Sequence, residues 1–135
     1  MKGETDEIAV AYDWALADAY LYLERSEEAL KLLAQRETAL PKNYNPPHYL
    51  ARVYHKLKRE EEALTAIDKA ITLAYGPRKA GMMSLKADIL EGLNKPADAK
   101  TALEEQLKLY QALPEGQKLP EKEAAATARI EKLSK

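Results

Sequence analysis

Cysteine is absent from this sequence, and only five of its 135 residues are glycine. The lack of cysteine excludes disulfide scaffolds, iron–sulfur clusters, thiol catalysis and cysteine-rich zinc sites. So few glycines leave no Gly-rich loop that could cradle a phosphate. No apolar run approaches the ~20 residues that a membrane-spanning helix needs, and residues 1–7 lack the apolar stretch of a signal peptide. We therefore expect a soluble chain with no cofactor and no membrane partner.

An excess of charge of one sign is also missing. Lysine and arginine together number 21, aspartate and glutamate 22, and the formal net charge is -1. Because a nucleic-acid binder needs a net basic surface, we expect no nucleic-acid partner. The sequence also shows no constellation of base, nucleophile and orienting group, so we expect no enzymatic activity. Apolar residues make up 46% of the chain, which is enough for a folded core.

A short pattern recurs three times along the chain, at residues 23–30, 57–64 and 93–100. Each copy begins with leucine and carries a small or acidic residue, an acidic residue and then alanine. That alanine stands at positions 29, 63 and 99, so the copies are 34 and then 36 residues apart. A near-constant period of this length indicates a repeat architecture.

Each copy of the pattern lies between two stretches with helical spacing of apolar residues. Leu50, Ala51, Tyr54 and Leu57 repeat the spacing of Leu16, Ala17, Tyr20 and Leu23. Residues separated by three or four positions share one face of a helix, and no stretch shows the two-residue alternation of a strand. Prolines fall between the predicted helix pairs, where they are tolerated in a first turn. The sequence therefore predicts an all-α fold.

A helix–turn–helix unit of this period resembles the tetratricopeptide repeat. The second copy carries the family pattern most fully, with Leu50, Ala51, Tyr54, Ala63, Ile67 and Ala70. The third copy departs from it at Lys86 and Gln106. The resemblance implies a single domain over residues 1–135, built as a right-handed solenoid of three antiparallel helix pairs at about 8–41, 44–77 and 78–113. A capping helix at about 121–133 would follow.

The resemblance also implies a concave groove lined by the first helix of each pair, with no catalytic residue. Its predicted partner-binding residues are Trp14, Asp18, Tyr22, His48, Tyr49, Arg52, His55 and Asp88. Within the middle helix, His48, Arg52 and His55 lie at i, i+4 and i+7 and so share one face. Tryptophan, tyrosine and arginine are frequent hot-spot residues of interfaces. The alternative is that Trp14 is a core residue and that the histidines are simply solvated.

Two more specific kinds of site are not expected. One branch of the family grips C-terminal carboxylates with two lysines, two asparagines and an arginine. The equivalent positions here are Trp14, Asp18, Tyr49, Gly81 and Leu85, so the residues of that clamp are absent. His48 and His55 lie about 10.5 Å apart along a helix, which is too far to chelate one metal ion.

We therefore expect a non-catalytic interaction module whose partner is a protein or peptide segment. The alternative is a dimerisation or spacer domain attached to a catalytic domain in cis, with Leu107, Leu109 and Tyr110 as its apolar contact. Residues 40–47, 73–79, 85–90 and 112–117 also resemble the repeat segment beside thioredoxin-fold domains in some bacterial thiol–disulfide proteins. That narrower resemblance would make the catalytic domain a thioredoxin fold and would place the chain in the bacterial periplasm.

Overall fold

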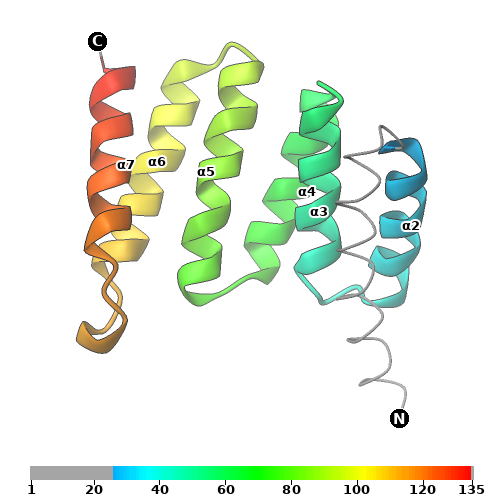
Figure 1. Ribbon diagram of the computed structural model, residues 1–135, viewed down its shortest axis with the longest axis horizontal. Helices are drawn as coiled ribbons and strands as arrows, with labels where there is room; N and C mark the ends of the chain where they lie inside the picture. The colour runs from blue at the N-terminus through cyan, green and yellow to red at the C-terminus, as the bar shows by residue number, and fades with distance from the viewer. Residues whose placement is uncertain (1–25, 135) are drawn as a thin grey trace. The chain divides into compact units, whose positions relative to one another are not determined.

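The computed structural model describes residues 26–134, and in this range the chain is helical, without any strand. The first of two compact units ends at Leu73 and contains α2 (Ser26–Ala39), α3 (Asn45–Lys56) and α4 (Glu60–Leu73). The second unit begins at Ala74 and contains α5 (Gly76–Gly92), α6 (Pro96–Gln111), a 3-10 turn (Glu115–Gln117) and α7 (Pro120–Leu133). Figure 1 shows the helices of each unit. The predicted all-α fold is confirmed.

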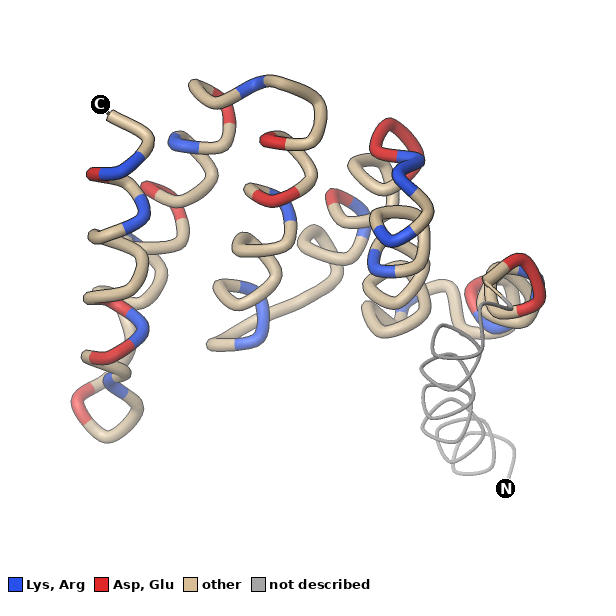
Figure 2. Tube along the Cα trace, turned by 45° about the horizontal axis from the view of Figure 1, so that its top comes forward, with Lys and Arg blue, Asp and Glu red and all other residues tan. Residues whose placement is uncertain are grey.

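The first turns of the helices contain residues suited to that position. Proline stands in the first turn of α3, α5, α6 and α7. Its missing N–H group costs little there, because the first N–H groups of a helix have no partner within the helix. The first turn of α4 instead carries Glu60, Glu61 and Glu62, seen as red at the start of that helix in Figure 2. Negative charge is favourable at this end of a helix.

Two helices end in the same way, at Lys58 after α3 and at Asn94 after α5. Both residues adopt a left-handed backbone conformation, with φ values of 61° and 59°. In the first turn Arg59 N donates to Tyr54 O at 2.8 Å, and in the second Lys95 N donates to Leu90 O at 2.8 Å. These bonds close the last helical turn and reverse the chain, so α4 and α6 each fold back on the helix before them.

The core of the first unit is built from small and branched residues. Ala29, Leu33, Val53 and Ile67 have no exposed surface. The small alanines let paired helices approach closely, and Ala63, an alanine of the recurring pattern, is also fully buried. An ion pair between Lys69 Nζ and Glu37 Oε2 at 3.3 Å joins α4 to α2 at the edge of this core.

The second unit has its own core, drawn from all three of its helices. Ile89 of α5 and Leu103 of α6 are fully buried, and Tyr110 of α6 and Ala126 of α7 are nearly so. The predicted apolar contact surface around Tyr110 is wrong in this respect, because the tyrosine faces the core. Tyr110 follows the buried Leu103 by seven residues, so helical periodicity places both on the same side of α6.

Candidate functional site

Three of the predicted partner-binding residues lie together on α3. The guanidinium carbon of Arg52 lies 5.0 Å from the centroid of the Tyr49 ring. The rings of His48 and Tyr49 lie 5.4 Å apart, centroid to centroid, with an angle of 50° between their planes. Tyr49 precedes Arg52 by three residues, so the helix itself brings the two side chains together. We call His48, Tyr49 and Arg52 the α3 cluster.

The α3 cluster has one exposed cationic group and one neutral ring at neutral pH. Arg52 is exposed, whereas His48 is half-buried. The pKa of His48 is lowered to about 4, first because burial disfavours the imidazolium form and second because the charge of Arg52 opposes it. The positive charge of the cluster is therefore that of Arg52, and His48 contributes a flat, uncharged surface.

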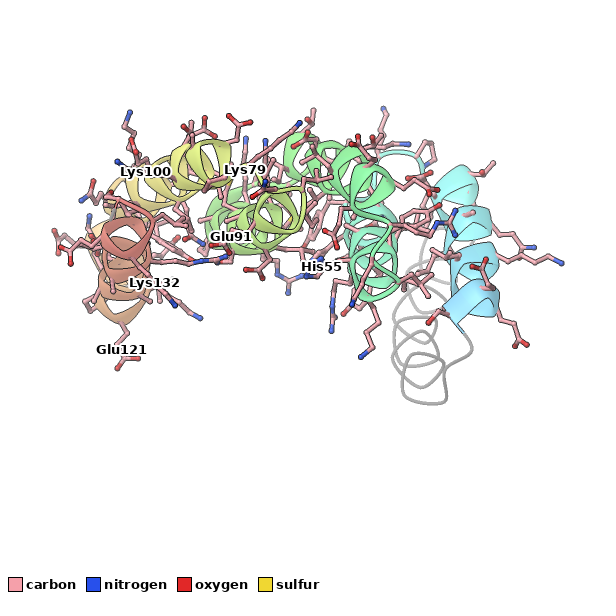
Figure 3. The ribbon with its side chains drawn as sticks, turned by 90° about the horizontal axis from the view of Figure 1, so that it is seen from above. His55, Lys79, Glu91, Lys100, Glu121 and Lys132 are labelled. Atoms are coloured by element: carbon pink, nitrogen blue, oxygen red, sulfur yellow. The ribbon has the colours of Figure 1, made fainter. Side chains whose placement is uncertain are left out.

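His55, one turn further along α3, makes a different kind of contact. Its Nδ1 atom lies 2.9 Å from both carboxylate oxygens of Glu60, the first residue of α4. The Glu60 side chain is only 10% exposed, and that of His55, which Figure 3 labels, is 35% exposed. The pair ties the end of α3 to the start of α4 across the left-handed turn at Lys58.

Asp88 lies in the second unit and already has a partner. Arg129 of α7 donates one hydrogen bond from Nη2 to Asp88 and another, of 2.9 Å, to Glu91 Oε2. The Nη1 atom of Arg129 donates to the backbone oxygen of Ser84 at 3.3 Å. Glu91 is labelled on α5 in Figure 3. The predicted binding residue Asp88 is thus part of an ion-pair network that joins α7 to α5.

Sequence reasoning missed Arg129 because α7 lies outside the repeated pattern. One signal was available, since Arg129 follows the buried Ala126 by three residues and so shares a face with it. That spacing indicates a side chain directed toward the rest of the second unit. The spacing does not predict which residues Arg129 contacts, because Asp88 and Glu91 stand about 40 residues earlier in the chain.

Gln106, which departs from the family pattern, is a buried polar residue of the second unit. Its side chain is only 3% exposed. Nε2 donates to the backbone oxygen of Ala80 at 2.9 Å and to Ser84 Oγ at 2.6 Å. A buried amide needs such partners, because an unpaired one would lose its hydrogen bonds to water. Gln106, where the sequence departs from the family pattern, therefore forms a polar link between α6 and α5.

The remaining predicted site residues, Trp14, Asp18 and Tyr22, lie outside the described residues. Within residues 26–134, no three histidine, aspartate or glutamate side chains are grouped so as to hold a metal ion. Of the helices in the same range, none has the length and apolar character needed to cross a membrane. What the first unit brings together is the α3 cluster, with His55 one turn away.

The structure pairs α3 with α4 and α5 with α6 as helical hairpins, and comparison with known proteins shows what the first of these hairpins is similar to. Residues 50–76 match the tetratricopeptide repeat family. This segment spans most of α3 and all of α4. The predicted resemblance to the tetratricopeptide repeat is confirmed. No curated protein sequence matches the chain.

Solved structures with the same fold include several that were determined as complexes. The second tetratricopeptide-repeat domain of human RPAP3, in complex with an HSP70 peptide, has a TM-score of 0.73 and 18% identity, with 96% of this chain and 98% of that chain covered. PcrH, in complex with the chaperone-binding region of PopD, has a TM-score of 0.76 and 17% identity, covering 95% and 92%. A T3SS complex from Aeromonas hydrophila has a TM-score of 0.75 and 17% identity, covering 93% and 81%. These likenesses establish the fold.

Proposed function

We propose that this chain is a non-catalytic module that binds a segment of a partner protein against the exposed face of α3. The observation that carries the proposal is the Tyr49–Arg52 stack, 5.0 Å from guanidinium to ring centroid, beside the neutral ring of His48. A planar cation held against an aromatic ring is partly pre-ordered, so binding costs less side-chain entropy than it would for a free arginine. Tyrosine and arginine are also the residue types that dominate interface energetics.

The fold supports the same proposal. Two of the structures that share it were solved with a bound polypeptide, an HSP70 peptide in one case and the chaperone-binding region of PopD in the other. By analogy, the partner here is an extended or helical protein segment. Trp14, Asp18, Tyr22 and His55 remain predicted members of the binding surface, as does Asp88. The spacer role and the link to a thioredoxin-fold domain remain predictions that no observation here favours.

The test begins with a selection that assumes no partner. Random peptides displayed on phage are selected against the wild-type chain, and the enriched peptides are synthesised and titrated by fluorescence anisotropy. The double variant Tyr49→Ala, Arg52→Ala should bind them at least tenfold more weakly, since two hot-spot side chains of about 1 kcal/mol or more each are removed. Circular dichroism confirms that the variant is still folded.

The chain offers a matched control for this experiment. Tyr75 and Arg78 are also a tyrosine and an arginine three residues apart, and both are exposed. The double variant Tyr75→Ala, Arg78→Ala removes the same chemistry from another place and should leave the affinity of the selected peptides unchanged. Equal losses in the two double variants, or no loss in the first, would overturn the assignment to α3.

A further inference from the structure

A groove runs between α2 and α4 in the first unit, with α3 as its floor. The Cα atoms of α2 and α4 lie more than 8 Å apart, and the space between the two helices has a volume of about 310 Å³. The residues that line it include Glu37, Leu50, Tyr54, Glu62, Ala66 and Lys69. Helical periodicity places Leu50 and Tyr54 on the opposite side of α3 from Tyr49 and Arg52. The groove is therefore distinct from the α3 cluster.

The floor of the groove is apolar and partly aromatic. Leu50 is 5% exposed and Ala66 is 8% exposed, and Tyr54 is half-buried. The ring of Tyr54 already has one guanidinium against it, since the Cζ atom of Arg59 lies 5.0 Å from the ring centroid. A floor of this kind suits a group that is weakly hydrated and flat, because such a group loses little hydration on entering.

The two glutamates of the groove differ in how fully their carboxylate oxygens are used. Arg59 donates to both oxygens of Glu62, from Nε and from Nη2, at 2.8 Å each. Glu37 has only Lys69, whose Nζ atom lies 3.3 Å from Oε2, and Glu37 Oε1 has no partner among residues 26–134. The Glu37 side chain is 27% exposed. The groove therefore contains a partly buried carboxylate with one oxygen ready to accept a hydrogen bond.

We propose that this groove binds an arginine side chain of a partner polypeptide, with the guanidinium on Glu37 and the aliphatic stem over Leu50 and Ala66. The residues that line the groove carry two carboxylates and one ammonium, so charge complementarity favours a cationic occupant. Lysine and arginine both combine an apolar stem with a cation. The guanidinium fits better than an ammonium, because it is planar, more weakly hydrated and able to rest against an aromatic ring.

The pair between Lys69 and Glu37 does not block this binding. Both side chains are accessible to water, at 50% and 27% exposure, and their atoms are 3.3 Å apart. An ion pair of this kind contributes little, so the ammonium can share the carboxylate or leave it at small cost. Lys69 is therefore a weak competitor of the partner arginine for Glu37.

The test is an NMR titration of the full-length ¹⁵N-labelled chain with small probes. N-acetyl-arginine N-methylamide should cause saturable shifts at the amides of Glu37, Leu50 and Ala66, with a Kd on the order of 10 mM, as suits one accessible ion pair. N-acetyl-citrulline N-methylamide has nearly the same shape without the charge and should leave these amides unmoved. Sodium chloride at matched ionic strength gives the baseline.

Variants of opposite expected effect connect the shifts to the proposed residues. E37Q should weaken binding of the arginine probe roughly fivefold or more, whereas K69Q, which removes the competing ammonium, should strengthen it roughly twofold. E105Q removes an exposed glutamate from the second unit and should bind as the wild type does. Circular dichroism checks that each variant is folded.

Equal shifts with the arginine and citrulline probes, binding that E37Q leaves intact, no gain in K69Q, or no shift at up to about 50 mM probe would each overturn the proposal. N-acetyl-lysine N-methylamide should bind at least threefold more weakly than the arginine probe, and equal affinity would overturn the choice of a guanidinium. The outcome does not depend on the α3 cluster. The titration can fail while phage-selected peptides still require Tyr49 and Arg52, and the reverse is equally open.

Discussion

The half-buried imidazole of His48 makes the stability of the fold depend on pH. Its pKa is about 4 in the folded chain and 6.5 in the unfolded one. Between these values the unfolded chain binds a proton that the folded chain does not, so the free energy of unfolding falls as the pH drops from 6.5 toward 4. The full shift would correspond to roughly 3 kcal/mol, and solvent access to the ring reduces this to about 1–2 kcal/mol.

Comparison with His48→Gln isolates this contribution from that of the carboxylates, which titrate in the same range. Urea unfolding of both proteins at pH 7 and pH 4.5 should show the wild type losing about 1–2 kcal/mol more than the variant. NMR titration gives a direct control, because the chain has only two histidines and the variant assigns their signals. A His48 signal that titrates near pH 6.5 in the folded protein would contradict the prediction.

The sequence predicted those parts of the site that depend on one helix alone. The spacing of His48, Arg52 and His55 was sufficient to expect that they share one face of α3, because α-helical geometry fixes which neighbours meet. The Arg129–Asp88 pair could not be predicted, because it depends on how α7 docks against α5. The same is true of the Gln106 amide, whose partners Ala80 and Ser84 stand on another helix.

At the scale of whole elements, the turns after α3 and after α5 differ in how well their left-handed residue tolerates a positive φ. Lys58 and Asn94 have nearly the same φ, yet lysine pays a steric cost there that asparagine partly avoids and glycine avoids entirely. Lys58→Gly should therefore raise the free energy of unfolding by about 1 kcal/mol, even though glycine is more flexible in the unfolded state. Asn94→Gly should raise it by less, and urea denaturation of the two variants measures the difference.

A second lysine variant serves as the control for the turn. Lys56→Gly places glycine at the last residue of α3, where the backbone is right-handed, and it should destabilise the chain by up to about 1 kcal/mol. If Lys58→Gly also destabilised, the turn after α3 would not have the left-handed geometry described here. If Asn94→Gly raised the free energy of unfolding as much as Lys58→Gly, the identity of the replaced residue would not matter.

For the molecule as a whole, the sequence predicted helices and a repeat because both depend on periodicity. The Leu50, Ala51, Tyr54 and Leu57 spacing falls within α3 and its turn, and residues 50–76 match the tetratricopeptide repeat. Periodicity did not predict that the contacts of the chain divide at residues 73 and 74 into two compact units. That division depends on which side chains contact one another across helices, and the repeated pattern does not encode it.

The second unit has the internal links needed to fold by itself. Gln106 joins α6 to α5 and Arg129 joins α7 to α5, while Leu103 and Ala126 lie in the shared core. We expect a fragment of residues 74–135 to give a helical circular dichroism spectrum and a cooperative thermal transition. A fragment of residues 74–113, which lacks α7, should be largely unfolded, because a single helix pair cannot bury its apolar face. If both fragments gave coil-like spectra, the second unit would need the rest of the chain to fold. If both fragments were equally helical, α7 would not be needed for the core of the second unit.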